Sequence, residues 1–254
     1  SLALGIVPSC TVLAVSGART EIGRTLFGRN YDAGPKWADF TLYRTYPESG
    51  FAHIGCSYGM LVGREDGMNE AGLAIACTGV QGRYTAELGV WDHIPVRAAL
   101  ELCRTAGEAE ELVRGLPHLF TKNFLVADAA GDIAVIEAAQ QGVSVVHPKD
   151  GFGAIANHFV GPQMQAYNDW TKIPANSKER LERAERWGCS AAARREALGS
   201  EGIKRVLSSS SEGVRSELGP EFTTVWSWVA ELGERRISLC NHLPEADAYR
   251  ACGF

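Results

Sequence analysis

The chain has 254 residues, of which 45% are hydrophobic and 22% are charged, and its formal net charge at pH 7 is −5. This composition is typical of a soluble globular protein with a sizeable core. Basic residues gather only where acidic residues are interleaved, which argues against nucleic-acid binding, and no apolar run is long enough to predict a membrane span.

The seven cysteines are scattered along the chain without CxxC spacing. Such an odd, unpaired set predicts reduced thiols and a cytoplasmic location, and it argues against a disulfide framework or a structural zinc site. The six histidines have no metal-like spacing either. We therefore expect neither a metal nor another cofactor.

The first predicted element is a β-hairpin. Residues 11–16 are β-branched and apolar, residues 17–23 are polar and turn-rich, and residues 24–31 resume an extended pattern. Antiparallel pairing would place Cys10 across from the stretch Arg29 to Asp32 at the end of the second strand. A cation such as Arg29 lowers the pKa of a nearby thiol, which makes Cys10 a candidate nucleophile. The alternative is a small buried hydrophobic residue beside a surface ion pair.

The remaining sequence alternates between runs of strands and runs of helices. Strands are predicted at 41–45, 51–57, 59–62 and 73–78, with a tight turn at 67–73, and two helices follow at 91–103 and 106–116. Further strands are predicted at 124–127, 133–138, 143–146 and 152–157, followed by helices at 177–195 and 203–207 and a hairpin at 223–231 and 236–240. This order predicts an α+β protein with a four-layer αββα sandwich, in which helices lie outside two packed, mostly antiparallel sheets.

Several short motifs coincide in this chain. In order they are Cys10-Thr11, Gly28-Arg29-Asn30-Tyr31-Asp32, Gly67-Met68-Asn69-Glu70-Ala71-Gly72-Leu73, Ala156-Asn157-His158-Phe159, and Ser177 with Arg180 and Arg183. Each is weak alone, but five in this order are specific. Together they resemble the N-terminal-nucleophile hydrolases of the peptidase C45 family, typified by acyl-coenzyme A:6-aminopenicillanate acyltransferase. Choloylglycine hydrolases and penicillin V acylases are related to that family.

The resemblance implies a self-processing enzyme that cuts or makes a linear amide. Residues 1–9 would be a short propeptide, and residues 10–254 would form a single domain. Cys10 would attack the carbonyl of Ser9, release residues 1–9, and become the first residue of the mature chain. Its new α-amino group, with a pKa near 8, would then serve as the general base.

The resemblance also implies roles for other residues. Asp32 would orient the freed amino group, Arg29 would lie beside the thiol, and the Asn157 side-chain amide would stabilise the oxyanion. Arg180 would brace the aspartate, with Arg183 as the alternative. A second oxyanion donor is expected from a backbone N–H near Thr78. Asn69, by contrast, is expected to be a turn residue without a chemical role.

Two other functions stay open at the level of the sequence. One is a non-catalytic, unprocessed binding relative with the same fold. The other is an ordinary cysteine hydrolase in which His158 pairs with Cys10. For the self-processing enzyme that the resemblance implies, we expect a small N-acyl substrate and no nucleic-acid or membrane partner, with an acyl-thioester donor and a homo-oligomer as open alternatives. Aromatic residues could line an acyl pocket, namely Tyr31, Trp37, Tyr43, Tyr58 and Trp91.

Overall fold

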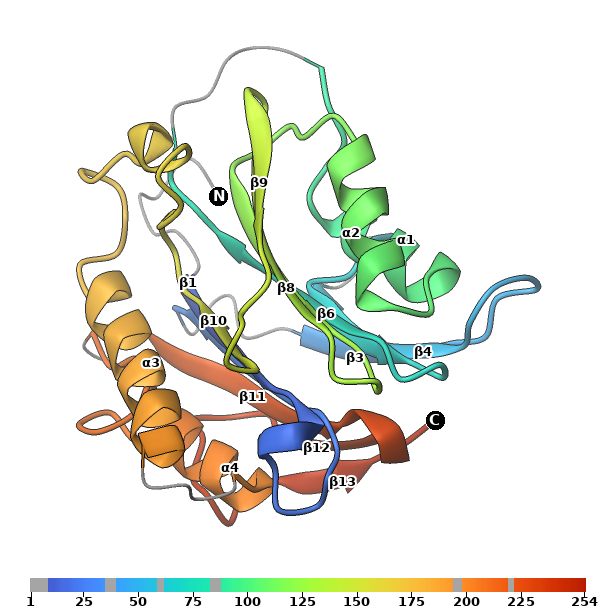
Figure 1. The fold of residues 1–254 in the computed structure, drawn as a ribbon, viewed down its shortest axis with the longest axis vertical. Coiled ribbons are helices and arrows are strands. Elements are labelled where there is room, and N and C mark those ends of the chain that lie inside the picture. Colours follow the sequence, from blue (N-terminus) through green and yellow to red (C-terminus); the bar gives the residue numbers. More distant parts are fainter. Residues whose placement is uncertain (1–8, 35–39, 59–61, 83–87, 194–197, 219–221) are drawn as a thin grey trace.

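Two stacked antiparallel sheets form the centre of the protein (Figure 1). The computed structural model describes residues 9–34, 40–58, 62–82, 88–193, 198–218 and 222–254. The six-stranded sheet has the order β10 (Phe152–Ile155), β1 (Ser9–Val15), β2 (Leu26–Ala33), β11 (Thr223–Glu231), β12 (Arg236–Cys240) and β13 (Arg250–Cys252). The seven-stranded sheet follows the chain from β3 to β9: β3 (Phe40–Thr45), β4 (His53–Tyr58), β5 (Asp66–Asn69), β6 (Ala74–Gly79), β7 (Lys122–Ala127), β8 (Ile133–Ala139) and β9 (Gly142–Val146).

Helices cover the outer face of each sheet. Helices α1 (His93–Leu102) and α2 (Ala106–Gly115) pack on the seven-stranded sheet, and α3 (Ser177–Ala193) and α4 (Ser200–Ser208) pack on the six-stranded sheet (Figure 1). The predicted four-layer αββα sandwich is therefore confirmed. Short 3₁₀ helices lie at Gly17–Arg19, Gln165–Tyr167 and Leu232–Glu234. Within the described parts of the chain, no helix is both long and apolar enough to cross a membrane.

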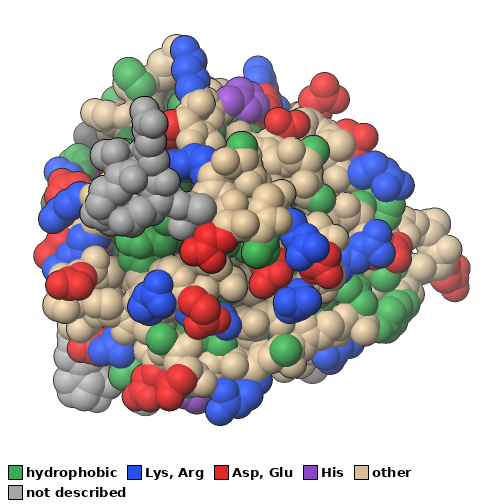
Figure 2. Space-filling model, turned by 60° about the horizontal axis from the view of Figure 1, so that its bottom comes forward, with side chains coloured by type: hydrophobic (Ala, Val, Ile, Leu, Met, Phe, Trp, Pro, Cys, Tyr) green, Lys and Arg blue, Asp and Glu red, His purple; other side chains and the backbone are tan. Residues whose placement is uncertain are grey.

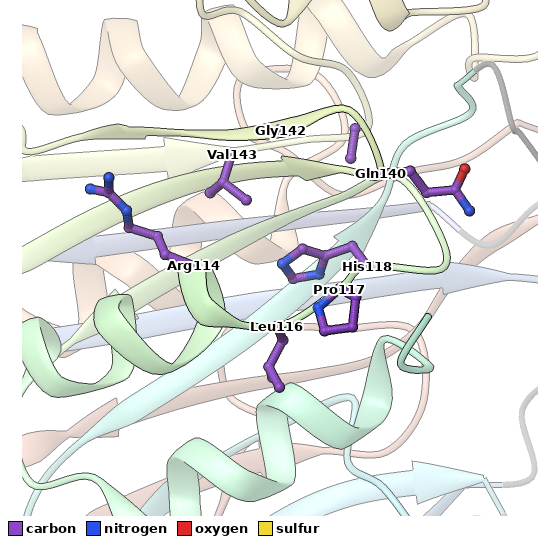
Figure 3. A pocket seen from close by; sticks show the side chains of 8 residues that line it. Arg114, Leu116, Pro117, His118, Gln140, Gly142 and Val143 are labelled. Carbon is purple, nitrogen blue, oxygen red and sulfur yellow. The ribbon is translucent and has the colours of Figure 1, made fainter. Parts of the chain in front are cut away.

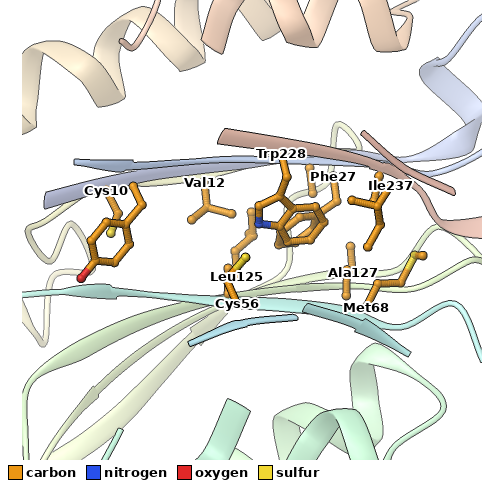
Figure 4. Packing of buried hydrophobic residues seen from close by; sticks show 14 of the residues in the cluster. Cys10, Val12, Phe27, Cys56, Met68, Leu125, Ala127, Trp228 and Ile237 are labelled. Carbon is orange, nitrogen blue, oxygen red and sulfur yellow. The ribbon is translucent and has the colours of Figure 1, made fainter. Parts of the chain in front are cut away.

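The main core fills the space between the two sheets, and Figure 4 shows it edge-on. The alternation of side chains along each strand turns one row from every strand into this layer. A second apolar cluster lies between the seven-stranded sheet and helices α1 and α2, and a third lies between the six-stranded sheet and helices α3 and α4. Cys10 lies at one end of the central core, in line with Val12 (Figure 4). The labelled residues from the six-stranded sheet are Cys10, Val12, Phe27, Trp228 and Ile237, and those from the other sheet are Cys56, Met68, Leu125 and Ala127.

Most predicted elements are found, and the differences are local. The hairpin is confirmed as β1 and β2, whose register pairs Cys10 with Tyr31. The tight turn predicted over 67–73 is wrong in part, because β5 extends through Asn69 and only Glu70 to Gly72 turn. Most of the strand predicted at 59–62 lies outside the described residues. Strand β13 was not predicted, because three largely exposed residues carry no periodic signal.

The surface is mixed in charge on the face shown in Figure 2. Lysine and arginine side chains are interspersed there with aspartate and glutamate side chains. Such interspersion is typical of the solvated surface of a soluble domain.

Gly55 on β4 sets how closely β5 can approach, and so where Asp66 lies. A Cβ atom at position 55 would lie 2.1 Å from the carbonyl oxygen of Asp66. We therefore expect Gly55→Ala to lower the free energy of unfolding by about 1–3 kcal/mol, measured by denaturant titration. Gly115→Ala is the matched control, because a Cβ there meets nothing within 4 Å and should change stability little. Equal stabilities of the two variants would contradict this assignment.

Candidate active site

Cys10 is the second residue of strand β1. Antiparallel pairing with β2 places Ser9 opposite Asp32 and Cys10 opposite Tyr31. The Cys10 side chain is buried, and its Sγ accepts a hydrogen bond from Nη2 of Arg29 at 3.2 Å. The thiol and the guanidinium that the sequence predicted to be neighbours are therefore in contact.

Arg29 crosses from the six-stranded sheet to the seven-stranded sheet. It is fully buried, and its Nη1 donates to the carboxylate of Asp66 and to the carbonyl oxygen of Glu65, the latter at 2.9 Å. Its guanidinium carbon also lies 4.9 Å from the ring centre of Tyr31 and 5.0 Å from that of Trp226. A carboxylate and two aromatic faces thus replace the water that this cation loses.

The charge state of Cys10 follows from its burial. Burial raises the pKa of the Cys10 thiol to about 11, although the Arg29 cation acts in the opposite direction. The carboxylates of Glu65 and Asp32 add to the increase. At neutral pH the sulfur is therefore a thiol, and its proton must be transferred when the sulfur attacks.

Asp32 lies at the end of β2 and is fully buried. Its Oδ1 accepts a hydrogen bond from the Thr224 hydroxyl at 2.7 Å, and its Oδ2 lies 3.6 Å from Nη1 of Arg180. Burial raises the pKa of Asp32, while Arg180 and the Thr224 hydrogen bond oppose that increase. Among the described residues, Oδ2 receives no hydrogen bond, so it is open to a further donor.

Arg180, and not Arg183, reaches the site from α3. Its Nη1 donates to the Cys10 carbonyl oxygen at 2.6 Å and to the Thr11 hydroxyl, and its Nη2 donates to the Ser9 hydroxyl. Arg183 instead pairs with Glu179 at 2.5 Å. Residues three positions apart lie on the same side of a helix, so spacing alone does not separate the two arginines. In the structure the Arg180 side chain is buried, whereas that of Arg183 is 21% exposed.

Asn157 follows β10 and faces the amide bond between Ser9 and Cys10. Its Oδ1 accepts hydrogen bonds from the Cys10 backbone N–H at 2.9 Å, from the Ser9 hydroxyl at 2.6 Å, and from Nη2 of Arg180 at 2.8 Å. Its Nδ2 donates to the carbonyl oxygen of Gly79 at the end of β6 at 2.8 Å. The side chain therefore joins both sheets at the residue that would form the new N-terminus.

Thr78 and Ser177 secure the loop that carries Asn157. The Thr78 hydroxyl donates to the carbonyl oxygen of Ala156, and the Asn157 backbone N–H donates to Oγ of Ser177 at 2.9 Å. The end of β6 is thus bonded to the backbone of the loop that carries Asn157. This is the region in which the sequence predicted a second backbone donor, and that donor stays a prediction.

His158 is directed to Ser177 and not to Cys10. Its Nδ1 lies 2.8 Å from Oγ of Ser177. Burial, with the nearby cations Lys178 and Arg180, lowers the pKa of His158 to about 4. The structure therefore offers no support for the alternative pairing of His158 with the Cys10 sulfur.

Sequence reasoning missed three residues that hold this centre together. These are Glu65 and Asp66, which face Arg29, and Thr224, which donates a hydrogen bond to Asp32. Ser177 was part of the predicted motifs, but its hydrogen bond with the Asn157 backbone was not predicted. Their partners lie far away in the chain, so local spacing contains no signal for them.

The aromatic residues suggested for an acyl pocket have separate environments. Tyr31 stacks on Trp226 in the core, Tyr43 lies against Arg64, and Trp91 is half exposed beside Phe120. Trp37 and the side chain of Tyr58 lie outside the described residues.

A cavity of about 300 Å³ lies between the end of α2 and the turn from β8 to β9 (Figure 3). The residues that line it belong to α2, the segment after α2, and the β8–β9 hairpin, and none of these carries Cys10, Arg29, Asp32, Asn157 or Arg180, so we assign the cavity no part in the reaction. It is lined by Arg114, Leu116, Pro117, His118, Ala139, Gln140, Gly142 and Val143. In the described part of the chain, no group of three or more His, Cys, Asp and Glu side chains is arranged to hold a metal ion.

Solved structures define the class of protein to which this fold belongs. A variant of the conjugated bile acid hydrolase from Clostridium perfringens superposes with a TM-score of 0.67 and 15% identity over 96% of this chain and 92% of that one. The N-acylethanolamine-hydrolyzing acid amidase ortholog from Caenorhabditis elegans gives 0.63 and 16% over 88% and 93%. Penicillin V acylase from Agrobacterium tumefaciens gives 0.56 and 17% over 91% and 83%. The fold is therefore that of the N-terminal-nucleophile hydrolases.

Sequence comparison identifies the family within that class. Residues 19–245 match the family described as acyl-coenzyme A:6-aminopenicillanic acid acyl-transferase. The match covers most of the chain, so the protein belongs to this family of amidohydrolases and acyltransferases. No curated protein matches its sequence. The predicted resemblance is confirmed, while the roles of the individual site residues stay predictions.

Arg180 and Arg183 allow a matched test of the buried network. We expect Arg180→Met to lower the free energy of unfolding by about 3–5 kcal/mol, because it leaves the Asp32 carboxylate buried without its cation. Arg183→Met should cost less, about 1–2 kcal/mol, because its pair with Glu179 lies at the surface and its hydrogen bonds to the carbonyl oxygens of Ser210 and Gly213 are only part-buried. Denaturant titration measures both, and similar losses would contradict the assignment of Arg180 to the site.

The neutral His158 predicts a pH dependence of stability. Its pKa is lowered to about 4 in the folded protein but lies near 6.5 in the unfolded chain, which therefore binds more protons between those values. The free energy of unfolding should fall from pH 6.5 to pH 4, by on the order of 2 kcal/mol from this group. His158→Gln should flatten that fall. An unaltered slope in His158→Gln would overturn the prediction.

Proposed function

We propose that this protein is a self-processing cysteine amidohydrolase or acyltransferase that acts on linear N-acyl amides through an acyl-enzyme on Cys10. The observation that carries the proposal is the environment of the amide between Ser9 and Cys10. Asn157 accepts a hydrogen bond from the N–H of this amide, and Arg180 donates to the Ser9 hydroxyl before it and to the Cys10 carbonyl oxygen after it. The Cys10 sulfur next to it accepts a hydrogen bond from Arg29. This convergence of three side chains from different elements on Ser9 and Cys10 supports a chemical role for the bond between them.

The first reaction would be the cleavage of the chain itself. The Cys10 sulfur attacks the carbonyl carbon of Ser9, a C–S bond forms, the C–N bond breaks, and the Cys10 nitrogen takes up the thiol proton. Water then hydrolyses the thioester, which releases residues 1–9 with a new carboxyl group and restores the thiol. Ser9 is held for this step by Asn157 and Arg180. Residues 1–9 would then be the propeptide and residues 10–254 the mature domain.

The second reaction repeats this chemistry on a substrate. The free α-amino group of Cys10 accepts the thiol proton, and its ordinary pKa near 8 suits that task. Oδ1 of Asn157, which accepts a hydrogen bond from this nitrogen, and the open oxygen of Asp32 would orient the amine. The Nδ2 of Asn157 and a backbone N–H near Thr78 would stabilise the oxyanion, each donor contributing on the order of 3 kcal/mol.

The substrate is proposed at the level of its class. The named relatives include a hydrolase of conjugated bile acids, a hydrolase of N-acylethanolamines and a family of acyl-transferases. These names support a small N-acyl substrate, with water or an amine as acceptor and possibly an acyl thioester as donor. The seven free cysteines support the expected reducing, cytoplasmic setting. A homo-oligomer stays a proposal.

Intact-protein mass spectrometry tests the processing step. Wild-type protein should lose the mass of residues 1–9, because only a Cys10 thiol can carry out the acyl shift, and Cys10→Ala should keep its full mass. Cys189→Ala, which removes an exposed thiol, is the control and should be processed like wild type. Retention of the full mass by wild type would contradict self-processing and favour the non-catalytic binding relative.

A further inference from the structure

The Arg29 guanidinium that faces the Cys10 sulfur also faces a second anion. The same nitrogen, Nη2, lies 3.2 Å from the Cys10 sulfur and 3.7 Å from Oε2 of Glu65. The thiolate of Cys10 and the carboxylate of Glu65 therefore share one cation. Whatever neutralises Glu65 leaves more of the Arg29 charge for the sulfur.

His93, at the start of α1, neutralises Glu65 from the opposite side. Its Nε2 lies 2.7 Å from Oε1 of Glu65. The His93 side chain is 11% exposed, so it can exchange protons with solvent, whereas Arg29 and Cys10 cannot do so directly. A continuous row of contacts thus runs from the outer helical layer to the sulfur.

We propose that Glu65 and His93 act as a pair of positioning residues, which hold Arg29 at the Cys10 sulfur and make its positive charge available to the thiolate. Neither residue touches the reacting atoms. This second proposal rests on the proposed function only in that Cys10 is taken as the reacting thiol.

The protonation states of the pair fit this role. Burial acts to raise the pKa of Glu65, but the contacts with His93 and Arg29 outweigh it and lower this pKa to about 2. Burial likewise opposes the charged form of His93, yet the Glu65 carboxylate raises the pKa of His93 above its usual 6.5. His93 is therefore charged below that raised value and loses its charge as the pH rises through it. At a pH above that pKa, the unneutralised Glu65 carboxylate competes with the Cys10 thiolate for the positive charge of Arg29.

The other charged groups around the pair are themselves paired. Lys122 of β7 contacts Asp92, which precedes α1 and also approaches Nδ1 of His93 at 3.4 Å. Asp66 of β5 is bound to Nη1 of Arg29, away from the nitrogen shared by Glu65 and the sulfur. The Cys77 thiol of β6 lies 3.6 Å from Oε2 of Glu65. His93 is thus the group in direct contact with Glu65 that can change charge near neutral pH.

The test is the rate at which iodoacetamide labels Cys10, followed by mass spectrometry of the peptide that contains it. This readout needs no substrate and separates Cys10 from the other six cysteines. We expect His93→Gln to slow labelling at pH 7.5 about three- to tenfold, because an unbalanced Glu65 carboxylate raises the pKa of the Cys10 thiol and so lowers its thiolate fraction. Glu65→Gln should label at least as fast as wild type. His53→Gln, a buried histidine on β4, is the control and should behave as wild type.

The double variant and the pH profile distinguish this role from a structural one. His93→Gln combined with Glu65→Gln should label like Glu65→Gln alone, because His93 acts only through Glu65. In wild type the rate should rise less than tenfold per pH unit where His93 loses its proton. The full slope should return in Glu65→Gln, and in His93→Lys, which keeps a positive charge.

Three results would overturn the proposal. One is equal slowing by His93→Gln and Glu65→Gln with a still slower double variant, which is the pattern of structural damage. Another is an unchanged rate in His93→Gln. The third is a wild-type Cys10 that takes no label between pH 6 and pH 10. Self-cleavage is scored separately by intact mass, so any of these results is distinguishable from a failure of the proposed function.

Discussion

The structure depends on one buried interaction, the contact of Arg29 with Asp66 between the two sheets. Taking a guanidinium out of water costs several kcal/mol unless a counter-ion and polar or aromatic groups replace its hydration. Here β2 provides the cation and β5 the carboxylate, while Tyr31 and Trp226 stack on the guanidinium. The ion pair therefore fixes how the two sheets face each other at this end of the core. Because the Cys10 sulfur is held by the same arginine, it also fixes the candidate nucleophile.

A second buried cation completes the centre from the other side. Arg180 reaches inward from α3 to the Cys10 carbonyl, to Asn157 and toward Asp32. With His93 of α1 at the opposite end, all four layers of the sandwich contribute to one row of polar groups through the molecule. Cys10 lies in the middle of that row. An apolar residue could replace none of these groups without leaving a buried partner unpaired.

This arrangement has a consequence for the chemistry. The thiol of the uncut chain has a pKa of about 11, and its own nitrogen is an amide that cannot act as a base. In the proposed mechanism, cleavage before Cys10 creates the amine that takes the thiol proton, at a point already bonded to Asn157. The site would thus be assembled first and receive its general base last, which would confine the turnover of substrate to the matured chain.

The sequence predicted the layers and the near neighbours of Cys10, but not the supports of the site. Alternation and turn residues located the first hairpin, so Cys10, Arg29 and Asp32 were placed together by local rules alone. Spacing could not decide between Arg180 and Arg183, because both lie on one helix and only packing shows which face is inward. Asp66 and Glu65 were missed because their partner Arg29 lies in the other sheet, and contacts between sheets leave no trace in local periodicity.

The most direct test of the central claim is to trap the acyl group. The protein would be incubated with an activated N-acyl amide and quenched in acid, and the N-terminal peptide would be analysed by mass spectrometry. The account predicts a peptide that begins at Cys10 and carries the acyl group as a thioester on that residue. An acyl group found only on other residues, or turnover without any adduct on Cys10 and undiminished in Cys10→Ala, would contradict it.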